Sequence, residues 1–153
     1  MSDGDGSGVE TGLVLVTNGE FAGWKVCAAD PFEQRAGPFY ETTDDDGNAV
    51  IAFRAQPRHM NGGGFMHGGC LMTFADMALF SIARRAMDGQ HGVTMTLSGD
   101  FLNAVRVGQR VEARGEVTRA GGKTVFVRGL VTADDQPALS FSGIIRKIAR
   151  RAD

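Results

Sequence analysis

The segment NGGGFMHGGCLMTFADMALF, residues 61–80, holds two features that could do chemistry. A glycine-rich stretch ends at His67, and one carboxylate, Asp76, follows within an almost wholly apolar run. Burying an unpaired carboxylate is costly, so its position needs an explanation. At helical spacing no cation can neutralise it, because the residues three and four positions away are Met72, Thr73, Leu79 and Phe80.

The His-Gly-Gly triplet lies where a helix is expected to begin. The backbone N–H groups of Gly68 and Gly69 would then lack helical partners and lie at the positive end of the dipole. Glycine lets a ligand oxygen approach closely, so these groups could form an oxyanion site. A base and an oxyanion site are the minimum equipment for acyl transfer. The simpler alternatives are that Asp76 pairs with a strand arginine or faces solvent, and that His67 only caps the helix.

The spacing of the two candidate groups predicts an oligomer. Gly68 and Asp76 are eight residues apart, which is about 12 Å along one helix. That distance is too long for both to act on one carbonyl. Two copies of the helix, antiparallel across a two-fold axis, would place Asp76 of one copy near Gly68 of the other. The sequence therefore predicts a dimer with two composite sites.

Composition excludes several classes of protein. The 153 residues suffice for one domain with one core, and the net charge of -2 without a basic stripe argues against nucleic acid. Cys27 and Cys70 fit neither a metal spacing nor a disulfide framework, so reduced thiols and a cytoplasmic location are expected. The acidic start lacks the features of a signal peptide, and no apolar run is long enough for a membrane span.

The amino-terminal part is expected to be simple. Residues 1–18 are predicted to form a disordered tail, and residues 19–153 a single domain. A short helix is expected within residues 18–26. A second helix should begin with Asp30 as N-cap and Pro31 at its first position, and stop by Gly37.

A hairpin, a central helix and four further strands are expected to follow. Residues 38–55 form the hairpin, with its turn at residues 46–48. The helix spans roughly Gly68 to Met87, is closed by Gly89, and is apolar on every side, which indicates that other structure surrounds it. The strand segments are residues 91–102, 108–120, 123–134 and 137–148. Their short junctions predict an antiparallel meander, giving an α+β fold with five or six strands curled round one helix.

The motif around Asp76 resembles that of a known family. The order N-G-G-G-F-M-H-G-G-C-L-M-T-F-A-D is similar to the motif of hot-dog-fold acyl-CoA thioesterases of the PaaI (phenylacetic acid degradation) type. The resemblance covers about residues 37–148. It implies a hot-dog fold, an antiparallel sheet around a long central helix, that forms a homodimer. Tetramers, as dimers of dimers, are common in this family.

The resemblance also implies roles for individual residues. Asp76 matches the catalytic carboxylate, acting as general base or as nucleophile, and Gly68 matches the N–H donor to the thioester oxygen. His67 and Asn61 match positions that orient the carbonyl and the water, and Thr94 matches a hydroxyl that places the water. The positions implied to bind substrate or coenzyme A are Gly69, Thr96, Arg119, Lys123 and Thr124.

Plainer interpretations exist for most of these positions. Asn61 would suit the glycine loop as a turn residue with positive φ. Thr94 and Thr96 are ordinary strand residues, and turn charges such as Arg119 are commonly just solvated. One departure is Phe80, which stands where a related branch carries threonine; this favours the aspartate-type arrangement and leaves the hydroxyl role to Thr94.

The implied activity is hydrolysis of an aryl- or medium-chain acyl-CoA to the free acid and CoA. Side chains expected in the acyl pocket are Phe65, Met72 and Phe80. No metal or cofactor is expected, with coenzyme A entering only as part of the substrate. The alternatives are a non-catalytic acyl-CoA-binding module and an acyl-thioester hydratase or dehydratase, whose signature motifs the sequence lacks. No nucleic acid or membrane partner is expected.

Overall fold

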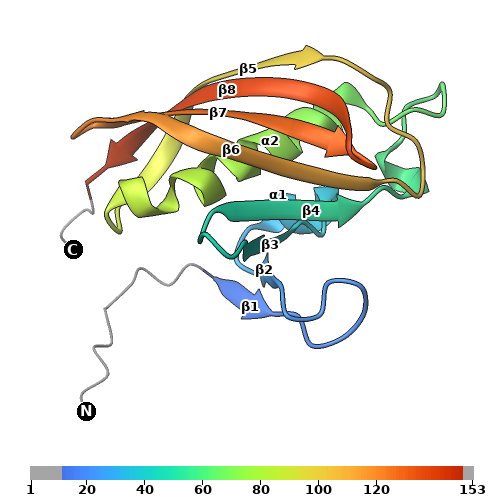
Figure 1. The fold of residues 1–153 in the computed structure, drawn as a ribbon, viewed down its shortest axis with the longest axis horizontal. Helices are drawn as coiled ribbons and strands as arrows, with labels where there is room; N and C mark the ends of the chain where they lie inside the picture. Colours follow the sequence, from blue (N-terminus) through green and yellow to red (C-terminus); the bar gives the residue numbers. More distant parts are fainter. Residues whose placement is uncertain (1–11, 150–153) are drawn as a thin grey trace.

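A curved sheet wraps one long helix in the computed structural model, which describes residues 12–149 (Figure 1). Eight strands lie in the order β1-β2-β3-β4-β6-β7-β8-β5, and every neighbouring pair is antiparallel. The strands are β1 Leu13–Leu15, β2 Lys25–Cys27, β3 Tyr40–Thr43, β4 Ala49–Arg54, β5 His91–Phe101, β6 Arg110–Ala120, β7 Thr124–Ala133 and β8 Gln136–Ile148. The helices are α1 Pro31–Ala36 and α2 Gly68–Ala83, with 3₁₀ turns η1 Pro57–His59 and η2 Arg84–Met87.

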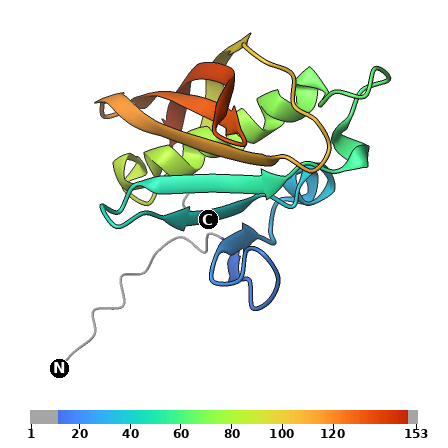
Figure 2. The ribbon, with the colours of Figure 1, turned by 45° about the vertical axis from the view of Figure 1, so that its right-hand side comes forward.

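Helix α2 forms the centre of the core. Phe74 and Leu79 of this helix are fully buried against sheet residues such as Phe53, Val111 and Ile145. The strands curve round the helix, as Figure 2 shows, and the short α1 also contacts it. A helix that is apolar all round is stable only when enclosed in this way. The predicted α+β hot-dog fold is confirmed.

Helix α1 is fixed by its amino-terminal cap. The Oδ1 atom of Asp30 accepts hydrogen bonds from the N–H groups of Phe32 and Glu33, at 3.0 and 2.9 Å, and Pro31 takes the first helical position as predicted. His59 then ties α1 to the loop before α2. Its Nδ1 accepts the Gln56 N–H at 3.0 Å, which leaves Nε2–H to donate to the Ala36 carbonyl at 2.8 Å. Burial lowers the pKa of His59, which favours this neutral ring.

The β3–β4 hairpin is confirmed, with its turn at the expected place. The carboxylate of Asp44 accepts hydrogen bonds from the N–H groups of Asp46 and Asn48, at 3.0 and 2.9 Å. Gly47 supplies the left-handed backbone conformation, with φ +80°. Such side-chain-to-backbone bonds let Asp define a tight turn.

Three expectations about the elements are wrong. The sheet has eight strands rather than five or six, because β1 and β2 extend it beyond β3. Strand β1 lies within the segment predicted to be disordered; the rest of that prediction, residues 1–11, lies outside the described residues. Residues 18–26 form turns and part of β2 instead of a helix, with Gly19 and Gly23 both at positive φ.

The order of the last four strands also differs from a simple meander. Strand β5 pairs with β8 at the sheet edge, not with β6. The connection from β5 to β6 crosses the amino-terminal end of α2, where the Met66 N–H bonds to the Val105 carbonyl at 2.8 Å. It then joins the Gly108 N–H to the Ala55 carbonyl at 2.9 Å. These hydrogen bonds hold the connection next to the end of β4, so β6 begins beside β4 and pairs with it.

The end of α2 is tighter than predicted. Regular α-helix stops at Ala83, and η2 continues to Met87 as a 3₁₀ turn. Asp88 and Gly89, with φ of 51° and 71°, reverse the chain into β5. Gly89 therefore ends the helical segment as predicted, but Asp88 also takes the left-handed conformation.

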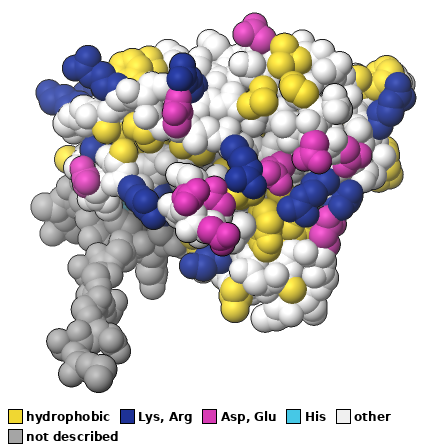
Figure 3. Space-filling view, viewed as in Figure 1, with side chains coloured by type: hydrophobic (Ala, Val, Ile, Leu, Met, Phe, Trp, Pro, Cys, Tyr) yellow, Lys and Arg dark blue, Asp and Glu magenta, His cyan; other side chains and the backbone are white. Residues whose placement is uncertain are grey.

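The outer face around β4 and β6 carries both signs of charge, as Figure 3 shows. Glu20 pairs with Arg54 and Arg110, and Arg114 pairs with Glu112 and Asp44. Acidic and basic groups therefore alternate on this face. Among the described residues, no helix has the length and apolarity that crossing a membrane requires.

Candidate active site

Asp76 lies midway along α2 with a hydroxyl partner. Its Oδ1 accepts a hydrogen bond from Thr94 Oγ1 of β5 at 2.6 Å, and its side chain is half-buried. Within residues 12–149 no arginine, lysine or histidine forms an ion pair with it. The alternative of a strand arginine is therefore wrong. The carboxylate keeps one oxygen free for a further partner.

The beginning of α2 presents a single open backbone donor. His67 is the N-cap, and its Nδ1 accepts the Gly69 N–H at 2.9 Å. The Gly68 N–H has no hydrogen-bond partner among the described residues. The expectation that both glycines offer free N–H groups is therefore corrected to Gly68 alone. The capping interpretation of His67 is right, and it leaves Nε2 as the ring nitrogen open to a ligand.

Asn61 organises the glycine loop rather than taking a left-handed conformation. Its Oδ1 accepts the N–H groups of Gly63 and Phe65, at 2.9 and 3.1 Å. The positive φ in this loop belongs to Gly64, at +84°, and Asn61 is not among the residues with positive φ. Asn61 is therefore a turn residue, as the plainer interpretation has it, but it does not have the expected positive φ. The amide nitrogen of Asn61 makes no hydrogen bond within the described part of the chain.

Strand β5 contacts both candidate groups. Thr94 bonds to Asp76, and the ring of Phe101 lies over the helix start, where a Cβ built on Gly68 would be 3.2 Å from Cζ. These two strand residues would normally face opposite sides, because they are an odd number apart. A bulge at Met95 shifts the register between Thr94 and Thr96, so both Thr94 and Phe101 face α2.

The remaining sequence-predicted residues lie elsewhere. Thr96 is exposed on β5. Arg119, Lys123 and Thr124 surround the β6–β7 turn, which lies beside the carboxyl-terminal end of α2 in both ribbon views (Figures 1 and 2). Within one chain this turn is at the opposite end of the helix from Gly68. The structure thus brings Asp76 and Thr94 together but separates both the turn and the helix start from them.

A half-buried carboxyl near Asp76 was missed by sequence reasoning. Glu33 projects from α1, and burial raises its pKa to about 7, with repulsion from Asp30, Glu41 and Asp76 adding to the effect. The local sequence offers only Asp30 as a signal, because the burial of Glu33 and the proximity of Glu41 and Asp76 arise from tertiary packing. Glu33 is therefore a carboxyl whose protonation is coupled weakly to the charge of the candidate base.

Replacing Glu33 by Gln is expected to change how stability depends on pH. Since the folded pKa lies above the unfolded value of 4.5, the neutral form favours folding below pH 4.5 and this contribution is lost as pH rises through about 7. After allowance for solvent screening, Glu33→Gln should be about 1 kcal/mol more stable than wild type at pH 8 and equal at pH 4.5. Urea unfolding at both pH values measures this, with exposed Asp45→Asn as control. An equal difference at both pH values would contradict the burial of this carboxyl.

The two cysteines form no disulfide. Burial raises the pKa of the Cys70 thiol to about 11, which makes it a poor nucleophile at neutral pH. No three His, Cys, Asp or Glu side chains among residues 12–149 are grouped so that they could hold a metal ion.

Comparisons with known proteins identify the class to which this hot-dog fold belongs, that of thioester hydrolases. Residues 63–139 match the thioesterase superfamily. A Pseudomonas aeruginosa protein named "Putative esterase PA0474" is 32% identical over 117 residues, covering 76% of this chain and 87% of that protein. The chain belongs to the thioesterase superfamily.

Solved structures with the same fold include two that are informative. Escherichia coli PaaI, from the phenylacetic acid degradation operon, superposes with a TM-score of 0.70 and 23% identity, over 79% of this chain and 86% of that one. A hypothetical thioesterase from Streptococcus pneumoniae, solved with coenzyme A, gives 0.66 and 21%, over 74% and 88%. At these identities the likeness establishes the fold.

Proposed function

We propose that this protein is an acyl-CoA thioesterase that hydrolyses an aryl- or medium-chain acyl-CoA to the free acid and CoA. The observation that carries the proposal is the Asp76–Thr94 pair, a carboxylate held by a hydroxyl and without a cation partner in the described residues. The open Gly68 N–H at the start of α2 supports it as the oxyanion donor. The choice of CoA rests on the fold relative that was solved with it.

The proposed site is completed by a second copy of the chain. Strand β5 has 11 residues and pairs only with β8 among the described strands, so its other edge is open. Val93, Met95 and Phe101 are 46%, 52% and 56% exposed along it. A long edge with exposed apolar side chains favours pairing with another strand. We therefore propose that the homodimer forms through β5 and that two dimers can pair further.

Antiparallel pairing of two β5 strands would produce the composite site. Thr94 and Phe101 lie in opposite halves of the strand, so a two-fold axis between them would bring Thr94 of one protomer towards Phe101 of the other. Asp76 would then lie near Gly68 of the second protomer, because Asp76 is bonded to Thr94 and Gly68 lies under Phe101 in each chain. This arrangement resolves the separation of about 12 Å within one helix.

The chemistry then needs few groups. The Gly68 N–H stabilises negative charge that develops on the thioester oxygen, a contribution of about 3 kcal/mol for a donor of this kind. Asp76 either removes a proton from the attacking water or attacks the carbonyl itself, forming an anhydride that water cleaves. In both routes the C–S bond breaks and CoA leaves as thiolate. Thr94 orients Asp76, while His67 and Asn61 orient the carbonyl and the water.

The same dimer also accounts for the proposed CoA-binding positions. Within each chain the β6–β7 turn lies beside the carboxyl-terminal end of α2, so Asp76 is between this turn and Gly68 along the helix. Arg119, Lys123 and Thr124 would then reach the phosphates of CoA, with Thr96 and Gly69 along the pantetheine. Phe65, Met72 and Phe80 are proposed to contact the acyl group. The proposal uses no metal or other cofactor.

Thr94→Val tests the orienting role of the hydroxyl. Valine keeps the shape of threonine but removes the hydrogen bond, so kcat is expected to fall about tenfold while KM changes little. Steady-state kinetics with an acyl-CoA and a thiol-trapping dye measure this. Thr94→Ser keeps the donor and should retain most of the activity. Equal losses in both variants would show that packing, not the hydroxyl, matters at this position.

The substrate class is tested with a panel of CoA thioesters. Aryl-, medium-chain and long-chain acyl-CoA, and one acyl thioester of acyl carrier protein, are incubated with the protein, and release of free thiol is followed with the dye. Release should be fastest with the aryl- or medium-chain members. Release only from thioesters of another carrier, such as acyl carrier protein, would overturn the assignment to CoA.

A further inference from the structure

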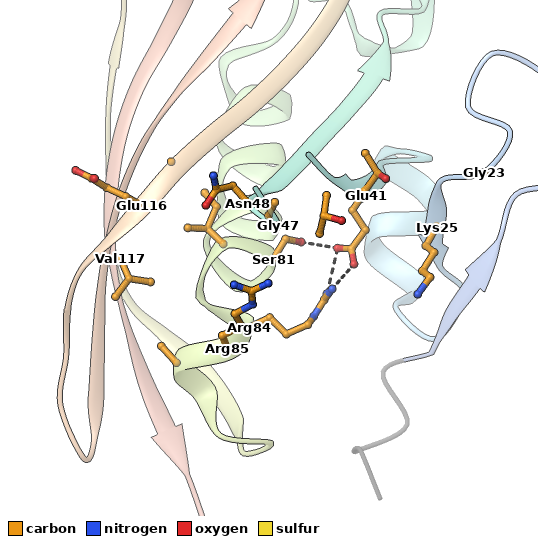
Figure 4. A pocket seen from close by; sticks show the side chains of 16 residues that line it. Gly23, Lys25, Glu41, Gly47, Asn48, Ser81, Arg84, Arg85, Glu116 and Val117 are labelled. Atoms are coloured by element: carbon orange, nitrogen blue, oxygen red, sulfur yellow. Dashed lines mark hydrogen bonds and ion pairs between the residues drawn. The ribbon is translucent and has the colours of Figure 1, made fainter. Parts of the chain in front are cut away.

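A separate cavity of about 490 Å³ lies at the carboxyl-terminal end of α2 (Figure 4). Its walls come from α2 and η2, from the β3–β4 hairpin, and from β6. None of the residues proposed for hydrolysis lines it. Its charged lining residues are Lys25, Glu41, Arg84, Arg85 and Glu116.

Glu41 is the fixed centre of this cavity. Its side chain is only 4% exposed, and both oxygens of its carboxylate accept hydrogen bonds. Ser81 Oγ donates to Oε2 at 2.6 Å, Arg84 Nη2 donates to the same oxygen at 3.1 Å, and Arg84 Nη1 contacts Oε1. A buried carboxylate bound in this way holds its arginine in one position.

The guanidinium of Arg84 retains donors for another partner. Guanidinium carries five N–H donors, and two of its nitrogens are engaged with Glu41. The side chain is still 49% exposed, so it forms part of the cavity wall and is not enclosed. The arginine is therefore pre-positioned, and ordering it on ligand binding costs little entropy.

The cavity also holds positive charge without a counter-charge. Glu41 neutralises Arg84, and Glu116 pairs with Arg128, which is outside the lining. Neither Lys25 nor Arg85 forms an ion pair with a carboxylate in residues 12–149. Two cationic side chains thus remain uncompensated in one concave site.

Arg85 is held against the hairpin turn. In Figure 4 its guanidinium points towards Gly47 and Asn48, whereas Arg84 turns to Glu41. A Cβ built on Gly47 would lie 2.7 Å from Arg85 Nη2, so the absence of a side chain there makes room for the guanidinium. Consecutive arginines therefore diverge to two sides of the same cavity.

We propose that this cavity is a second ligand site, which binds a small organic carboxylate between Arg84, Arg85 and Lys25. A planar carboxylate matches the open donors of guanidinium. A volume of about 490 Å³ is within the range of small-molecule sites. A carboxylic acid is also the class of product that a thioester hydrolase releases.

The test uses succinate, benzoate and inorganic phosphate as probes at constant ionic strength. Titration calorimetry measures affinity, and amide chemical shifts of ¹⁵N-labelled protein locate the site. Succinate or benzoate should bind saturably and shift the amides of Gly47, Arg85 and Gly115. Asp76→Ala should bind the same probes equally, because it does not line the cavity.

Arg85→Gln should weaken carboxylate binding about tenfold, the effect of losing one charge-assisted contact. Arg85→Lys should retain most of the affinity, and the matched exposed Arg146→Gln of β8 should be unchanged. Shifts confined to Gly68 and Gly69 would place the anion at the helix start and overturn the proposal. So would unaltered affinity in Arg85→Gln, tighter binding of phosphate than of either carboxylate, or no saturable binding at all.

Discussion

Asp76→Ala is expected to lower kcat for acyl-CoA hydrolysis about 10³-fold, the loss that follows removal of a catalytic base. The side chain is half-buried and bonds only to Thr94, so the variant should keep its fold and dimer. Thiol release measures the rate, and light scattering with circular dichroism measures assembly and folding. The charge-matched control is Asp45→Ala in the exposed hairpin turn, which should be fully active.

Activity within a few-fold of wild type in Asp76→Ala would remove this residue from the mechanism. Asp76→Asn is a weaker test, because an amide can still orient a water molecule. A loss of activity that accompanies a loss of dimer would show a structural role instead, so both measurements are made on the same preparation.

The second large effect is restoration of activity by two inactive variants. Gly68→Pro removes the oxyanion N–H, and proline is compatible with the first position of a helix. Its kcat should fall about 10²-fold to 10³-fold. Gly68→Ala adds a Cβ against Phe101 but keeps the N–H, so it isolates the donor from crowding.

Co-expression of Gly68→Pro with Asp76→Ala should restore about a quarter of wild-type activity. Half of randomly assembled dimers are mixed, and each mixed dimer has one site with both groups intact. If each site lay within one chain, every site would lack one group and no activity would return. Co-purification with two affinity tags isolates the mixed dimer, which should then show half of wild-type activity.

Local residue patterns made both α-helices predictable from the sequence. Asp30 and Pro31 mark the start of α1, and the apolar surface of α2 identifies it as enclosed. The Asp76 candidate arises from one charge in an apolar run, and the structure adds the Thr94 contact that no spacing rule supplies.

Long-range features were not predictable in the same way. The pairing of β5 with β8 depends on how the connection crosses the start of α2, which short junctions do not indicate. Glu41 reads as an ordinary strand residue, because its partners Ser81 and Arg84 are 40 and 43 positions away. The loss of Gly69 as a donor follows from the side chain of His67, whose rotamer is not encoded in the motif.

The irregularity at Met95 has an evolutionary consequence. Since Thr94 and Phe101 face α2 together only because one residue is left out of the ladder, shortening the strand there by one would turn one end of it outward. Such a deletion would disconnect either the Thr94 hydroxyl from its acid or Leu97 from the core. The length of this strand is therefore constrained on both sides of the bulge.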